Sequence, residues 1–159
     1  MPESPHAPDV QETQRLSHRH TDTLPPRTTL QGRYEIIKII GVGGMGAVYR
    51  AMDTRLNVLV AIKEMFPQPD LEATLLAELR QQFQQEALVL ARLQHPNLVR
   101  VTDFFEEGGN AYLVMDFVSG HSLAQYIESW GAIPEQQALA WAAELLDALA
   151  YCHSRGIIH

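Results

Sequence analysis

The chain has 159 residues, of which 46% are hydrophobic and 19% charged, and its formal net charge is −7. This composition is typical of a soluble globular domain, and it excludes a nucleic-acid-binding face because the 12 Lys and Arg residues are not clustered. The single cysteine, Cys152, excludes an intramolecular disulfide and a cysteine-based zinc site. No apolar stretch approaches the roughly 20 residues that a membrane-spanning helix needs.

Residues 1–29 are rich in Pro, Thr, His and charged side chains and contain no apolar core that could serve as a secretory signal. We therefore expect a disordered tail. His6, His18 and His20 lie within it, but nothing in the pattern fixes their geometry or adds a softer ligand. We interpret them as solvated side chains and predict no metal site.

Three strands are predicted after the tail. Residues 34–40 are mostly aromatic or β-branched and lead into a glycine-rich segment, GVGGMG, while Val48 and Tyr49 favour a second strand. Residues 53–57 are typical of a turn, and residues 58–63 indicate a third strand that ends at a lysine. The glycine-rich segment thus follows one strand and precedes another.

A long helix is predicted over residues 71–93. Its apolar stripe recurs at intervals of three and four residues and consists of Leu79, Phe83, Glu86, Leu90 and Leu93. Glu86 is the one carboxylate in the stripe, and burying an unpaired charge costs several kcal/mol. We therefore expect Glu86 to be buried and paired with a cation from another element, for which the sequence offers Lys63.

A hairpin and two helices follow. Residues 98–105 and 111–117 are predicted strands joined through residues 106–110, so the sheet is expected to have five strands. Ser122 and Gln125 form the capping-box pattern of a short helix that ends near Gly131. Pro134 is expected to open a longer helix with the apolar stripe Ala138, Ala142, Leu145, Leu149 and Cys152.

The spacing G-x-G-x-x-G by itself leaves several readings open. A phosphate-binding Walker A loop is excluded because Ala47 and Val48 stand where Lys and Ser or Thr are required. A dinucleotide-binding fingerprint remains possible, with a helix over residues 47–56 and Glu64 as the ribose-binding acid. A third reading is a tight turn without any ligand.

The stretches that surround the loop resemble protein kinases. "IGVGGMGAVY" is similar to the glycine-rich loop of that family, "VAIK" to the strand with the phosphate-binding lysine, and "FQQEALVLARLQHPNLVRVTD" to the αC helix and the following strand. "YLVMDFVSGHSL" resembles the fifth strand and hinge, and "HSRGIIH" the approach to the catalytic loop. The order and spacing are most similar to bacterial serine/threonine kinases of the eukaryotic-like type.

This resemblance implies a set of ATP-binding residues. Gly41, Gly43 and Gly46 would let the loop close over the phosphates. Lys63, paired with Glu86, would hold the α and β phosphates. The remaining implied contacts comprise loop residues, adenine-pocket residues and hinge residues: Val42, Gly44, Met45 and Ala47; Ile40, Val48, Ala61 and Met115; and Asp116 and Val118.

The implied fold is α+β and protein-kinase-like, with a five-stranded antiparallel N-lobe sheet and one long helix. The N-lobe would cover residues 30–115, and residues 116–159 would form the hinge and the first two helices of a truncated C-lobe. Leu90, Val101 and His159 would belong to the hydrophobic column that links the lobes.

The family motif continues beyond His159 with the catalytic Asp and then the Mg²⁺ ligands, which these 159 residues do not include. We therefore expect an inert part of an ATP-dependent kinase whose longer parent would need Mg²⁺ and phosphorylate Ser or Thr of protein substrates. The alternative is a non-catalytic nucleotide-binding or regulatory module. We expect these residues in the cytoplasm, although a segment after His159 could anchor the parent to a membrane.

Overall fold

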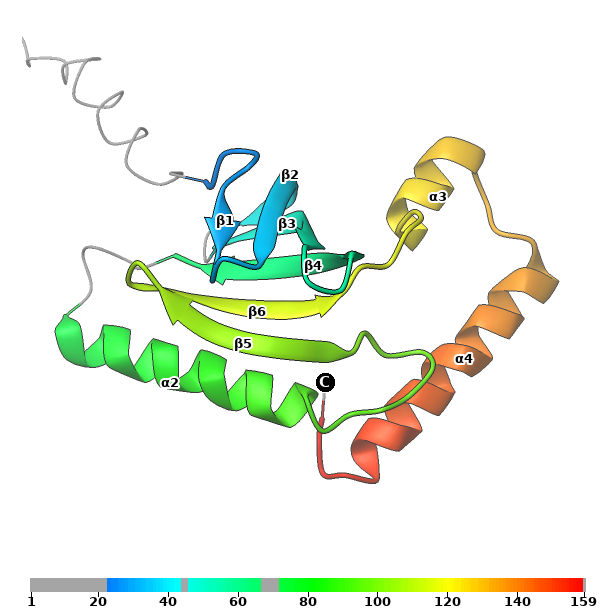
Figure 1. The fold of residues 1–159 in the computed structure, drawn as a ribbon. Coiled ribbons are helices and arrows are strands. Elements are labelled where there is room, and N and C mark those ends of the chain that lie inside the picture. The colour runs from blue at the N-terminus through cyan, green and yellow to red at the C-terminus, as the bar shows by residue number, and fades with distance from the viewer. Residues whose placement is uncertain (1–22, 44–45, 67–71, 159) are drawn as a thin grey trace, which may run out of the picture.

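The computed structural model describes residues 23–43, 46–66 and 72–158. The strands are β1 (Thr29–Leu30), β2 (Tyr34–Gly43), β3 (Gly46–Asp53), β4 (Val58–Met65), β5 (Val101–Glu107) and β6 (Asn110–Asp116). The helices are α2 (Ala73–Leu90), α3 (Leu123–Trp130) and α4 (Glu135–His153). A curled sheet carries α2 along the side of β5, and α3 and α4 follow the sheet (Figure 1). The predicted α+β arrangement is confirmed.

The strands of the described residues form one antiparallel sheet in the order β1-β2-β3-β4-β6-β5. It has one strand more than the five predicted, because the two-residue strand β1 pairs with β2. Sequence patterns do not reveal so short a strand. Residues 47–56 lie in β3 and the turn after it, so the helix that a dinucleotide-binding fold requires there is absent and that alternative is wrong.

The two faces of the sheet have separate cores. Strand β3 alternates strictly, with Ala47, Tyr49 and Ala51 buried and the residues between them partly exposed. These three side chains join a cluster that includes Ile62 of β4 and Val114 of β6. This period-two burial is what a strand with one apolar face produces. The residues between the buried ones, Val48 on β3 and its pairing partner Lys63 on β4, are therefore turned toward the other face.

Contacts to the sheet begin before the predicted end of the tail. The Leu24 amide donates a 3.0 Å hydrogen bond to the Tyr49 hydroxyl, and the Leu24 side chain packs against the buried cluster. The Arg27 amide donates to the Ile36 carbonyl at 2.8 Å. The segment from Leu24 onward thus belongs structurally to the sheet, whereas the sequence placed residues up to 29 in the tail. His6, His18 and His20 lie outside the described residues.

Helix α2 is shorter than predicted, and its buried side includes Phe83 and Leu90 of the predicted stripe but not Glu86. Phe83 and Ala87 are buried against Ala111 and Leu113 of β6. The expectation that Glu86 is buried is wrong, since 55% of its side chain is exposed. The predicted stripe follows the large side chains, whereas the small Ala87 also lies in the contact and lets the helix approach the sheet. Glu86 is thereby left at the edge of the contact.

The hairpin between β5 and β6 has a tighter turn than the sequence indicated. Glu107 pairs with Asn110, and the two residues between them are Gly108 and Gly109 with φ of 60° and 86°. Positive φ at both central positions is the type I′ geometry that matches the twist of antiparallel strands. The strands consequently extend further toward the turn than predicted.

Helix α3 begins with the predicted capping box, in which the Gln125 amide donates to the Ser122 hydroxyl and the Ser122 amide donates to the Gln125 side chain. It stops at Gly131, whose φ is 81°. Helix α4 starts directly after Pro134, as predicted.

Helix α4 contacts the chain mainly on one side. Ala148 and Cys152 are its buried residues. Of the predicted apolar stripe only Cys152 is buried, while Leu145 and Leu149 are 54% and 38% exposed and Ala138 and Ala142 are exposed as well. Large apolar side chains in the pattern do not reveal which face has a neighbour. None of the helices described is long and apolar enough to cross a membrane.

The loop between α2 and β5 holds the C-terminal half of α4. His95 Nε2 lies 3.1 Å from Asp147 Oδ2, and the Gln94 amide donates to the Tyr151 hydroxyl at 2.8 Å. Figure 1 shows this loop running beside α4. The segment that carries α2 is thus tied to the helical part of the chain.

Candidate functional site

The glycine-rich segment is the tip of the hairpin between β2 and β3. Gly43 pairs with Gly46, while Gly44 and Met45 lie outside the described residues. A Cβ added to Gly46 would overlap the Glu64 carbonyl oxygen of β4, so Gly46 is required by the packing of two strands. A Cβ added to Gly43 would meet nothing within 4 Å, and one added to Gly41 would contact Val48 at 3.9 Å. The open space therefore lies at Gly43.

Lys63 is placed by the middle strand of the sheet. It pairs with Val48 of β3 on one side and Leu113 of β6 on the other. Its Nζ lies 3.9 Å from Glu86 Oε1 and 5.5 Å from the centroid of the Phe83 ring. The predicted pairing is present, but 43% of the Lys63 side chain is exposed. The ammonium group thus remains accessible to a ligand.

An apolar wall lies beside Lys63 on the same face of the sheet. Ala61, two residues earlier on β4, pairs with Met115 of β6. Ile40 stands where the register between β2 and β3 shifts, and 45% of it is exposed. These side chains can line a flat apolar ligand. Ala47 differs, because its side chain is 1% exposed within the core on the other face, which leaves only its backbone for the predicted role.

The segment after β6 follows directly from this wall. The Asp116 amide donates to the Arg100 carbonyl at 3.0 Å, and the Asp116 carboxylate lies 3.3 Å from the Arg100 guanidinium. Val118 is 69% exposed. Its amide donates to no backbone carbonyl of the described residues. Val118 therefore retains a donor for the edge of a ligand.

The acidic side chains in the described ranges form no group of three or more with His or Cys that could hold a metal ion. Asp103 accepts a 2.7 Å hydrogen bond from the Tyr34 hydroxyl and lies 3.4 Å from the Arg33 guanidinium. Asp116 is paired with Arg100. Both aspartates are thus engaged by cations or hydroxyls, and the described residues do not fit a Mg²⁺ site.

Glu64 is a buried carboxylate whose environment the sequence did not predict. It is 1% exposed and accepts hydrogen bonds from the hydroxyls of Tyr49 and Tyr112 and from the Asn110 amide group. Burial, together with the bond to Glu64, raises the pKa of both tyrosines. The burial of Glu64 could have been predicted from the alternation of strand side chains. Because Lys63 faces one side of the sheet, the next residue of β4, Glu64, faces the core on the other side. The dinucleotide-binding hypothesis requires Glu64 to bind a ribose, but a carboxylate that is 1% exposed is not accessible to such a ligand.

Arg33 and Asp53 form a second pair that the sequence did not indicate. The guanidinium donates to both carboxylate oxygens at 2.7 to 3.1 Å, and the Arg55 and Leu56 amides add bonds of 3.0 and 3.2 Å. These hydrogen bonds lower the pKa of Asp53, and the largest effect comes from Arg33. The pair fixes the start of β2 to the end of β3. It therefore anchors the base of the hairpin whose tip is the glycine segment.

The family profile described as "Protein kinase domain" matches residues 34–159. The chain belongs to the protein kinase family. This match explains why the glycine hairpin, Lys63 and α2 occur together on one antiparallel sheet.

Individual relatives agree with this family. The chain is 39% identical over 135 residues to the serine/threonine-protein kinase pkn2 of Myxococcus xanthus, which covers 85% of this chain and 16% of the relative. It is 35% identical over 130 residues to the serine/threonine-protein kinase PrkC of Bacillus subtilis, covering 82% of this chain and 19% of the relative.

A solved structure also matches. The crystal structure of the Mycobacterium tuberculosis PknI kinase domain superposes with a TM-score of 0.70 at 31% identity, over 86% of this chain and 53% of that one. The chain thus spans about half of a solved kinase domain and less than a quarter of these two curated relatives.

Two residues that the resemblance to kinases would place in a hydrophobic column, Leu90 and Val101, lie together here. Leu90 of α2 and Val101 of β5 both pack against the cluster around Phe83 and Leu113. Met115 packs against the same cluster. His159, the third member predicted, lies outside the described residues. The cluster connects α2 to the wall beside Lys63.

Proposed function

We propose that this chain is the nucleotide-binding part of an ATP-dependent serine/threonine protein kinase, and that ATP binds between the glycine hairpin, Lys63 and the hinge. The observation that carries the proposal is the Lys63 ammonium group, 3.9 Å from Glu86 and 43% exposed, on a sheet that belongs to the kinase family. A structural ion pair would not need the hairpin with open space at Gly43.

The phosphates would lie between the hairpin and Lys63. Gly43 leaves room for a close approach of backbone amides, which a Cβ would narrow. Lys63 supplies a positive charge for the α and β phosphates, while Glu86 restrains its position. Because the pair is half exposed, binding of the phosphates does not require a buried ion pair to break.

The adenine ring would lie against the apolar wall made by Ile40, Val48, Ala61 and Met115. Ala61 is the small residue of this wall, and its pairing with Met115 places the long thioether side chain beside it. The Val118 amide, exposed at the hinge, would donate to the edge of the ring. The Asp116 amide is already bonded to Arg100, so it is the Asp116 carbonyl that remains as a partner for the ring.

Phosphoryl transfer depends on positioning and electrostatic stabilisation by Mg²⁺ and a carboxylate that accepts the hydroxyl proton. The described aspartates near the hinge are engaged with Arg33, Tyr34 and Arg100. We therefore propose that a polypeptide of these 159 residues binds ATP without transferring its γ-phosphoryl group. A longer protein that contains it would phosphorylate Ser or Thr of proteins, in the cytoplasm.

Calorimetric titration of the 159-residue chain with ATP, adenosine and NADH tests the proposal. We expect ATP to bind more tightly than adenosine, and NADH not to compete. A transfer assay with radiolabelled ATP and a generic protein substrate is expected to stay at background. Equal affinities for ATP and adenosine would contradict the role of Lys63, and incorporation of label would contradict the proposed inactivity.

A further inference from the structure

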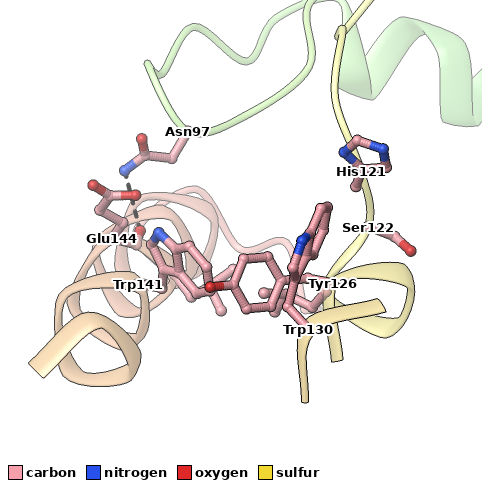
Figure 2. A pocket seen from close by; sticks show the side chains of 9 residues that line it. Asn97, His121, Ser122, Tyr126, Trp130, Trp141 and Glu144 are labelled. Carbon is pink, nitrogen blue, oxygen red and sulfur yellow. Dashed lines mark hydrogen bonds between the residues drawn. The ribbon is translucent and has the colours of Figure 1, made fainter. Parts of the chain in front are cut away.

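A second pocket lies on the helical part of the chain, away from Lys63. It is an open pocket with a volume of about 580 Å³, lined by residues of α3, of α4, of the segment before α3 and of the loop between α2 and β5 (Figure 2). This volume is in the range of ligand-binding pockets. None of its lining residues comes from β2, β3 or β4. It is therefore a site separate from the proposed ATP cleft.

Aromatic side chains dominate this pocket. Tyr126 stands between the two tryptophans, with ring centroids 5.0 Å from Trp130 and 5.5 Å from Trp141. His121 lies 5.3 Å from Trp130, which is 59% exposed. Figure 2 shows the rings in a row along the pocket. Indole and phenol faces attract cations through their quadrupole, and tryptophan does so most strongly.

A carboxylate stands at one end of the row. Glu144 is the lining residue with a formal charge, and its backbone carbonyl accepts a 3.2 Å hydrogen bond from the Asn97 amide group, which fixes the loop to α4. Residues 117–158 carry the four carboxylates Glu128, Glu135, Glu144 and Asp147 against a single arginine, Arg155. The helical segment that contributes most of the pocket lining therefore has an excess of negative charge.

Several aromatic rings elsewhere in the described residues have a cation from the chain itself. Arg155 lies 3.7 Å from the Tyr151 ring centroid, Arg33 lies 4.7 Å from Tyr34, and Arg50 lies 5.1 Å from Phe117. Within residues 23–43, 46–66 and 72–158, no Lys or Arg covers Tyr126, Trp130 or Trp141. The pocket combines uncovered rings with an acidic neighbour.

We propose that this pocket docks an arginine side chain of a partner polypeptide. The guanidinium stacks on an indole face and pairs with the Glu144 carboxylate, and apolar residues beside the arginine contact Leu123 and Leu145. Arginine fits better than lysine because its planar group can stack and form hydrogen bonds at the same time. The site depends on the helical part of the chain and is independent of the proposed ATP binding.

Tryptophan fluorescence gives a direct readout, because the chain contains two tryptophans and both line the pocket. The 159-residue chain is titrated with a capped Ala-Leu-Arg-Leu-Ala peptide and with the same peptide carrying neutral citrulline instead of arginine. We expect a saturable change in emission for the arginine peptide and an affinity about tenfold lower for the citrulline peptide.

Glu144→Gln is expected to lower the affinity for the arginine peptide by about fivefold. Glu135→Gln, an exposed change on the same helix outside the pocket, is the control and is expected to leave this affinity unchanged. Circular dichroism checks that Glu144→Gln keeps the fold, which its exposed side chain allows. Lys63→Met is expected to leave the peptide affinity unchanged, which separates this site from ATP binding.

Equal affinity for the two peptides would overturn the proposal, since the pocket would then be a simple apolar groove. The absence of a saturable change for the arginine peptide would overturn it as well. Emission that depends on protein concentration and does not respond to the peptide would show that a second copy of the chain occupies the pocket.

Discussion

Lys63 Nζ lies 3.9 Å from Glu86 Oε1, and the two side chains are 43% and 55% exposed. A pair this open to water is screened and contributes little to the free energy of folding. Its value is positional, because it joins β4 to α2 beside Phe83, over which the ammonium group lies at 5.5 Å. The Lys63 ammonium group is thus held in position by Glu86 and Phe83 but remains accessible to a ligand.

Lys63→Met is expected to reduce ATP affinity by about tenfold to a hundredfold, the range of a charge-assisted contact, and to leave adenosine affinity nearly unchanged. Adenosine has no phosphate for the lysine to contact. The chain offers a matched control, since Lys38, its one other lysine, is exposed on β2. Lys38→Met should bind ATP like the unchanged chain. Calorimetry decides, and an equal loss for both ligands would contradict the assignment.

Glu86→Gln is expected to lower the free energy of unfolding by less than about 1 kcal/mol, because the pair that it breaks is exposed. A buried pair, which the apolar stripe of the sequence suggested, would lose several kcal/mol. Urea denaturation distinguishes the two. Glu78→Gln, an exposed change on the same helix, is the control. A loss of about 3 kcal/mol would mean that Glu86 is enclosed.

The sequence predicted the strands, the capping box and the Lys63–Glu86 pairing, but it predicted the pairing from the burial of Glu86, which the structure does not have. Periodicity locates large apolar side chains, whereas the closeness of α2 to the sheet depends on the small Ala87. The position of an exposed residue at the rim of a contact cannot be read from such a pattern.

The polar pairs between residues far apart in the chain could also not be predicted from the sequence. Glu64 meets Tyr112 across 48 residues of chain and Asn110 across 46. Arg33 meets Asp53 across 20 residues, through the pairing of β2 with β3. Local propensity indicates each strand, but the partner of a buried carboxylate depends on strand order, which was known only from the fold.

Gly46→Ala is expected to destabilise the chain by about 1 to 3 kcal/mol or more, because the new Cβ would overlap the Glu64 carbonyl oxygen and backbone atoms cannot rotate away. Gly43→Ala, with nothing within 4 Å of its Cβ, should keep the stability and affect ATP affinity instead. Thermal melts with and without ATP compare the two. Equal melting temperatures would contradict the strand contact at Gly46.

The Arg33–Asp53 pair is expected to make the free energy of unfolding fall as the pH is lowered into the acid range. Arg33 holds the pKa of Asp53 below its ordinary value of 3.8, so the carboxylate binds its proton less readily in the folded chain than in the unfolded one. The stabilisation is complete above pH 3.8 and is lost as the pH falls through the lower, folded value. Asp53→Asn should remove this part of the acid dependence.

Urea midpoints measured from about pH 6 downward test the expectation. Glu128→Gln is the comparison, since Glu128 is exposed on α3 and forms no ion pair within the described residues. If the curve of Asp53→Asn runs parallel to that of the unchanged chain at every pH, the carboxylate does not contribute through its ionisation.

The outer face of α4 is expected to make the 159-residue chain associate with itself. Leu139 and Leu146, seven residues apart and therefore on one side of the helix, are 64% and 65% exposed, and they face away from the buried Ala148 and Cys152. Exposed apolar patches of this kind promote association, because each covered Å² of apolar surface yields about 25 cal/mol.

Light scattering on a size-exclusion column should find dimers or larger species whose share rises with concentration. Leu139→Gln combined with Leu146→Gln should shift the chain toward the monomer, whereas Leu56→Gln, an equally exposed leucine in the turn before β4, should not. A chain that stays monomeric at all concentrations would show that this face is too small or too irregular to pair.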